Sequence, residues 1–234
     1  MEWFDSYEIR ARIAPTVIII LPLIIMFFSI FQIPESLITA LISLGLFFFV
    51  IYSLSFFIRE LGINMQKKLW EKAGGPPSTL IMTCEDLHLS LELKKQIYKK
   101  IKRKYEIELP RQNDQLNDPN NFSRIVEGVF NRVRADLHEK SQDDRWKKQN
   151  AEYGFLRNLA ASRLLWCILS LIGIFGCFIG WIFYKNDFIL IGLALNIIIF
   201  ISSIIFGWFK SQKVIEDAGF RYAEYAWNAF LTLP

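Results

Sequence analysis

Charged residues are missing from four long stretches of this chain, although they make up 21% of its composition. No Asp, Glu, Lys, Arg or His occurs within residues 13–34, 36–58, 164–184 or 188–209. As a helix rising about 1.5 Å per residue, each stretch can cross a hydrocarbon layer about 30 Å thick. Ion-coupled pumps and transporters usually carry ionisable groups near the membrane midplane, so this absence argues against that class of protein.

Cysteine and histidine are also scarce, with three and two residues respectively. Cys84, Cys167 and Cys177 predict neither a disulfide framework nor a zinc site, because two of them fall inside apolar stretches. His88 and His138 lie far from any metal-ligand spacing with a cysteine or a carboxylate. Since the sequence also offers no set of nucleophile, base and orienting group, we expect no metal, no cofactor and no enzymatic activity.

The four apolar stretches pair into two helical hairpins, because residues 33–36 and 185–187 leave room only for a turn. We therefore predict a mostly α-helical membrane protein in which two hairpins flank a cytoplasmic, mainly helical domain. The predicted parts are an interfacial segment, the first hairpin, the cytoplasmic domain, the second hairpin and a cytoplasmic amphipathic tail, at residues 1–12, 13–58, 59–162, 163–209 and 210–234 respectively.

Polar and helix-breaking residues inside the apolar stretches have two possible roles. Pro22 removes a backbone donor in the first span and predicts a kink, which is either static or a gating hinge. Ser43 in the second span, and Asn196 and Ser203 in the fourth, lie on faces of small and polar residues. Such faces serve helix packing or, in an oligomer of several chains, a water-filled lumen.

Small residues in the third span predict close helix packing. Gly176 and Gly180 are spaced four residues apart, as in the small-xxx-small motif that lets two membrane helices approach closely. The polar faces of the other spans lack an evident partner in a single chain, so we expect a homo-oligomer in the lipid bilayer.

The central domain contains a strongly basic helix, which we predict at residues 91–105. Leu87, Leu89, Leu91 and Leu93 alternate as in a strand, but from Leu93 onward the apolar residues follow a helical step. Its cationic surface predicts contacts with phosphates, with anionic lipid or with solvent alone. Within the eleven positions 94–104 none of the residues is acidic and seven are basic: Lys94, Lys95, Lys99, Lys100, Lys102, Arg103 and Lys104.

Further helices are predicted around this basic helix. The second span should continue to about residue 72, where two glycines and two prolines stop it. Ser123 is a candidate N-cap for an amphipathic helix, and a last helix should run from about Asp144 into the third span.

Two groups of residues in the central domain resemble the recurring motifs of a known protein family. The family comprises four-span membrane effectors of bacterial anti-phage systems, encoded beside nucleotidyltransferases in CBASS operons and in the related Hailong system. The likeness covers roughly residues 61–163 and the arrangement of spans, but Leu156 and Arg157 stand where the family has two arginines. The motif residues are Leu69, Trp70, Gly74, Gly75, Pro76, Ser78 and Thr79, and downstream Tyr153, Gly154, Phe155, Arg157 and Asn158.

The resemblance implies a tetrameric ion channel in the bacterial inner membrane. A nucleotide or a short single-stranded oligonucleotide, made by the partner nucleotidyltransferase, would bind the basic residues and Arg157 and control the pore. Opening would depolarise the membrane and cause abortive infection. The alternative, from the residues alone, is a non-conducting anchor or scaffold whose basic helix binds anionic lipid or a partner protein.

The distribution of basic residues predicts the membrane topology. Of 27 Lys and Arg, 26 lie outside the two hairpin turns, so the positive-inside rule puts both termini and the central domain in the cytoplasm. Single cysteines at Met1, Gln112 and Pro234 should be labelled only from the cytoplasmic side, and cysteines at Glu35 and Asp187 only from outside. Labelling of Gln112→Cys from outside would refute this topology.

Overall fold

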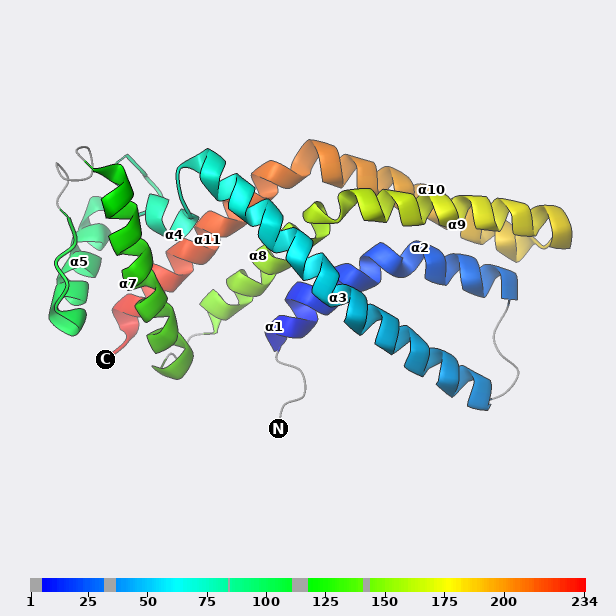
Figure 1. Ribbon diagram of the computed structural model, residues 1–234, viewed down its shortest axis with the longest axis horizontal. Helices are drawn as coiled ribbons and strands as arrows, with labels where there is room; N and C mark the ends of the chain where they lie inside the picture. The colour runs from blue at the N-terminus through cyan, green and yellow to red at the C-terminus, as the bar shows by residue number, and fades with distance from the viewer. Residues whose placement is uncertain (1–5, 32–36, 84, 111–117, 141–143) are drawn as a thin grey trace. The chain divides into compact units, whose positions relative to one another are not determined.

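The computed structural model describes residues 6–31, 37–83, 85–110, 118–140 and 144–234 (Figure 1). Every regular element within these ranges is a helix. Four of the helices are long and apolar enough to cross a membrane. The prediction of a mostly α-helical membrane protein with four spans is therefore confirmed.

The chain divides into two compact units. The span unit comprises Met1–Met65 and Gly154–Val214, and the polar unit comprises Gln66–Tyr153 and Ile215–Pro234. The polar unit thus takes in most of the predicted central domain together with most of the predicted tail.

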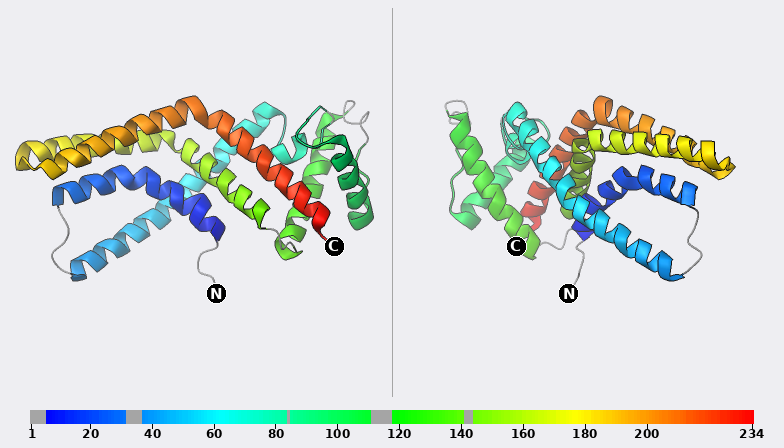
Figure 2. Two further views of the ribbon diagram at one scale, coloured as in Figure 1. Left: turned by 180° about the vertical axis from the view of Figure 1, so that it is seen from behind. Right: turned by 45° about the vertical axis from the view of Figure 1, so that its right-hand side comes forward.

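In the span unit three apolar helices lie against one another, as both views in Figure 2 show for α9 and α10. The turn between α9 and α10 is tight, because Lys185 is left-handed (φ 50°) and the Asn186 side chain accepts from the Phe188 amide. The predicted turn at residues 33–36 lies outside the described residues. The elements of this unit are α1 (Ser6–Glu8), the π-helix η1 (Ile9–Ile13), α2 (Ala14–Phe31), the first part of α3 (Leu37–Ala73), α9 (Arg163–Tyr184), α10 (Asp187–Ile204) and the π-helix η2 (Ile205–Lys210).

Glycines on α9 allow α2 to approach closely. A Cβ added at Gly176 would overlap the Met26 sulfur, and one added at Gly180 would lie 3.0 Å from Ile30. Both contacts join α9 to α2 of the same chain, so the packing role predicted for these glycines is confirmed.

The polar unit has its own apolar core. Buried side chains of α5, α7, α8 and α11 form most of it, with Trp146, Trp227 and Phe230 among the largest. The aromatic residues at the end of the chain thus pack into this core. The elements are the last part of α3 (Leu37–Ala73), α4 (Pro77–Leu80), α5 (Leu91–Tyr105), α7 (Pro119–Lys140), the first part of α8 (Arg145–Ala161) and most of α11 (Ser211–Thr232).

The helix ends follow local capping chemistry. α3 stops where Gly74 takes a positive φ of 84° and the Gly75 amide donates to the carbonyl of Trp70, as in a Schellman motif. α5 has the predicted bounds, with Ser90 as its N-cap. The predicted start of α7 at Ser123 is wrong, because α7 begins at Pro119. Asp118 precedes it as the cap, and its carboxylate accepts from the Asn121 amide at 3.0 Å.

The contact of α9 with its neighbours generates a stability prediction. Gly173→Ala should lower the free energy of unfolding by about 1–3 kcal/mol, because the new Cβ would lie 2.6 Å from Asn196 Oδ1 and 3.0 Å from the carbonyl oxygen of Pro22. Gly45→Ala is the control, since nothing lies within 4 Å of its added Cβ. Thermal unfolding in detergent measures both, and equal melting temperatures would contradict this packing.

Candidate functional site

Two of the seven basic residues of α5 are buried and serve the fold. Lys94 Nζ donates to the carbonyls of Thr83 and Asp86, each at 2.6 Å. Lys100 Nζ donates to the carbonyl of Leu231 at 3.1 Å and also to that of Leu233. Both ammonium groups satisfy backbone acceptors that lack a donor in a helix or sheet, so neither is available to a ligand.

The charge of Lys100 is held in an apolar setting. Its Nζ lies 5.4 Å from the ring centroid of Phe230, a cation–π contact. Burial, together with the neighbouring charges of Lys104 and Arg103, lowers the pKa of Lys100 below its ordinary value. This lysine therefore fastens the end of α11 to α5.

Lys104 belongs to a second, partly buried network. Its Nζ lies 3.0 Å from Asp136 on α7, which also accepts a 2.7 Å hydrogen bond from the Tyr105 hydroxyl. Burial alone would raise the pKa of Asp136, but the hydrogen bonds from Tyr105 and Lys104 outweigh burial and lower it. Burial and the bond to Asp136 raise the pKa of Tyr105. The network joins α5 to α7.

The remaining basic side chains of α5 are exposed. Lys102 pairs with Glu108 at 3.0 Å, and Lys95 lies 3.6 Å from Glu92. Among the residues that the structure describes, Lys99 and Arg103 have neither an ion pair nor a hydrogen bond. The cationic surface is therefore much smaller than the sequence pattern predicts, because the pattern cannot show which lysines are used inside the fold.

Arg157 belongs to the span unit, whereas the basic residues of α5 belong to the polar unit. It is buried, and its guanidinium donates to Asn158 Oδ1 at 3.1 and 3.2 Å. Asn158 Nδ2 in turn donates to the carbonyl of Ala11 at 2.7 Å. A Cβ at Gly62 would overlap Asn158 Oδ1, so the position of the Asn158 side chain explains why α3 needs a glycine there.

The polar unit contains a cavity of about 190 Å³ that the sequence analysis did not predict. It gathers residues of the upstream motif, the tyrosine of the downstream motif, one face of α7 and part of α11. The lining residues are Trp70, Pro76, Pro77, Ser78, Glu127, Phe130, Asn131, Arg134, Tyr153, Gly219 and Tyr222.

Aromatic rings form much of the cavity wall. Tyr153 and Tyr222 stack with centroids 6.4 Å apart and planes 5° apart, and Phe130 meets Tyr222 edge to face at 6.2 Å. α11 can approach this wall because Gly219 has no side chain: an added Cβ would lie 3.3 Å from Tyr153 and 2.9 Å from Pro77.

Polar side chains of α7 line another part of the cavity. Glu127, Asn131 and Arg134 follow one another at steps of four and three residues and so share one helix face. All three are exposed, and within the described ranges none has an ion pair or a hydrogen bond. The spacing was visible in the sequence, but nothing local indicated that this face borders a cavity.

Three of the predicted pore residues point into the chain's own helix contacts. Asn196 is fully buried and its Nδ2 donates to the carbonyl of Gly192 at 3.0 Å. Ser203 is buried, lies 3.0 Å from Cys167 Sγ, and donates to the carbonyl of Phe200. Pro22 is also buried, and α2 continues through it. This placement favours helix packing over a lumen for all three.

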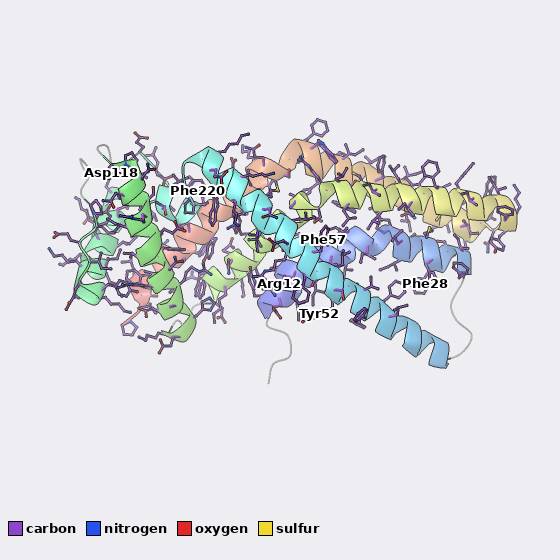
Figure 3. The ribbon with its side chains drawn as sticks, in the orientation of Figure 1. Arg12, Phe28, Tyr52, Phe57, Asp118 and Phe220 are labelled. Carbon is purple, nitrogen blue, oxygen red and sulfur yellow. The ribbon has the colours of Figure 1, made fainter. Side chains whose placement is uncertain are left out.

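The polar stripe of the second span has the opposite placement. Ser43 lies in α3 but outside the residues whose side chains the structure describes. Leu46, Val50 and Ser53 follow Ser43 at steps of three and four residues and so share its face of α3; all three are exposed. Tyr52 and Phe57, labelled in Figure 3, also lie on α3 and are exposed. No neighbour in the described part of the chain therefore covers this stripe.

Comparisons of the chain with known protein families, with curated proteins and with solved structures find no match. The candidate sites therefore stand on their geometry. Within the described ranges no three His, Cys, Asp or Glu residues lie close enough together to hold a metal ion.

The buried lysine of α5 can be tested against its exposed neighbour. Lys100→Met should lower the free energy of unfolding by about 1–3 kcal/mol, because it leaves the carbonyls of Leu231 and Leu233 without their donor. Lys99→Met removes the same charge one position away, from a side chain without a partner in the described structure, and should change stability little. Thermal unfolding in detergent compares the two, and equal losses would refute the structural role of Lys100.

Proposed function

We propose that the protein is an oligomeric channel of the bacterial inner membrane, controlled by a nucleotide or a short oligonucleotide that binds its polar unit. Both termini and the polar unit lie in the cytoplasm, and several copies, four in the simplest case, surround the pore. Opening depolarises the membrane and ends the infected cell's growth, as an anti-phage effector would.

The observation that carries this proposal is the set of helices that line the cavity. Trp70 lies on α3, Tyr153 on α8 and Tyr222 on α11. Each of these three helices contributes residues to both the polar unit and the span unit. A ligand that favours one arrangement of the three helices at the cavity can therefore bias the spans to which they lead.

The outward stripe of α3 is the best candidate for the pore wall. Leu46, Val50 and Ser53 are exposed in the single chain, whereas Asn196 and Ser203 of α10 are buried in contacts within it. Residues that line a lumen between subunits must not be covered by helices of their own chain. Ser43 lies on the same stripe, so its predicted pore role is kept in this proposal.

A second candidate function is a non-conducting membrane anchor. The buried positions of Asn196 and Ser203 favour it, because an anchor needs polar residues only to hold its spans together. On that hypothesis the exposed stripe of α3 faces lipid or another protein. The two functions differ in one measurable property, which is conductance.

Ion flux from liposomes that carry the purified protein tests the proposal. Flux should change when short oligonucleotides are added, and a charged thiol reagent should block Ser53→Cys because the modified side chain narrows the lumen. Ser202→Cys is the matched control, since Ser202 is an equally polar, exposed residue on α10. The reagent should leave flux through that variant unchanged.

The outcomes separate the two candidates. Absence of flux under every condition, from protein that is folded and oligomeric, would leave the anchor. Flux that is blocked equally at Ser53→Cys and Ser202→Cys would show a pore but would remove α3 as its specific wall.

A further inference from the structure

We propose that the cavity of the polar unit holds the base of a single nucleotide and that Arg134 contacts its phosphate. This inference rests on the proposed function, because it names the part of the molecule that recognises the ligand. The ligand is thus recognised at a site formed by α3, α7, α8 and α11, and not by the basic helix α5 as the sequence predicts. The argument depends on the size of the cavity, its walls and its polar edge.

The size of the cavity limits the ligand to one ring system. Its volume is about 190 Å³, and a protein cavity of about 150 Å³ is known to hold benzene. Sites for drug-sized ligands are larger, at about 300–1,000 Å³. A string of several bases therefore does not fit, but one base does, with its sugar and phosphate directed out of the cavity.

The walls suit a flat aromatic ligand. Trp70, Phe130, Tyr153 and Tyr222 contribute rings, and the stacked pair of Tyr153 and Tyr222 is set by the close passage of α11 at Gly219. Such rings bind bases through their faces, whatever the base is. Pro76 and Pro77 add rigid apolar surface beside them, so the cavity does not need to reorganise around a ring.

The polar side chains of α7 at the cavity offer hydrogen bonds and a positive charge, which a nucleotide needs in addition to stacking. Asn131 offers a paired donor and acceptor that match the edge of a base. Glu127 accepts from an amino group or a sugar hydroxyl, and Arg134 offers the planar fork of donors that suits a phosphate. Since none of the three has a partner in the described structure, binding a ligand breaks no existing ion pair or hydrogen bond.

The balance of charge excludes a simpler ligand. A site for a free anion would gather positive charge, but here one carboxylate, Glu127, lines the cavity together with the one guanidinium, Arg134. Inorganic phosphate would therefore meet repulsion as well as attraction. We expect recognition to require the base, with the phosphate adding affinity through Arg134.

Calorimetric titration of the full-length protein in detergent tests this inference. The probes are the four deoxynucleoside and four nucleoside 5′-monophosphates, the matching nucleosides, and inorganic phosphate. At least one monophosphate should bind the wild type, and inorganic phosphate should not. Arg134→Gln should weaken that monophosphate about tenfold to a hundredfold but leave its nucleoside unaffected, because only the charged contact is lost.

Two exposed residues provide matched variants. Asn131→Leu should weaken the nucleotide and the nucleoside alike, since it removes the contact to the base edge. Arg132→Gln removes the same charge as Arg134→Gln from an exposed neighbour that does not line the cavity, and it should bind as the wild type does. The double variant Lys99→Gln, Arg103→Gln on α5 should also bind each monophosphate with nearly unchanged affinity.

Three results would overturn the inference: no binding of any of the eight monophosphates, equal weakening by Arg132→Gln and Arg134→Gln, or loss confined to the α5 variant. These results are independent of conductance. Nucleotide binding by protein that carries no flux would uphold the cavity site and refute the channel. Flux controlled by oligonucleotides, without binding at the cavity, would uphold the channel and refute the cavity site.

Discussion

Polar groups within a hydrocarbon layer must find their partners inside the protein, and this constraint organises the span unit. Asn196 meets it in part: its Nδ2 donates to the carbonyl of Gly192 on its own helix, and its side chain packs against Gly173 of α9. The missing side chain at Gly173 also leaves room for the carbonyl of Pro22 on α2. α9 and α10 also expose apolar faces, but their contacts bury Asn196 and Ser203, whereas Ser53 of α3 is exposed. The proposal of α3 as a pore wall follows from this difference in where the polar residues lie.

The sequence predicted helices far better than it predicted what their side chains do. Charge-free stretches identified the four spans, and the helical spacing of apolar residues predicted the bounds of α5, where the structure adds Ser90 as the cap. The roles of the lysines on α5 were beyond local patterns, because their partners are distant in the chain: Leu231 and Leu233 for Lys100, and Asp136 for Lys104. A run of lysines looks the same whether it caps carbonyls or faces solvent.

The polar faces of the second and fourth spans also have roles that the sequence alone could not predict. These two faces have similar composition and spacing, so the sequence left packing and lumen open for both. The structure separates them, with Asn196 and Ser203 buried and Ser53 exposed. What decides between them is the rotation of each helix about its axis, which depends on glycines in a neighbouring helix and not on the stripe itself.

The cavity and the basic helix α5 would recognise a ligand through different physical properties. Exposed charges such as Lys99 and Arg103 attract any polyanion, including nucleic acid and the inner leaflet, with an affinity that falls steeply with salt. If the proposed function holds, so general an attraction cannot control a channel that kills its own cell. Shape and hydrogen-bond pattern discriminate among ligands of equal charge, because a wrong ring leaves Asn131 and Glu127 unpaired or is excluded by the aromatic wall. On the proposed function, ligand control is therefore better sought at the cavity of the polar unit than along its basic helix.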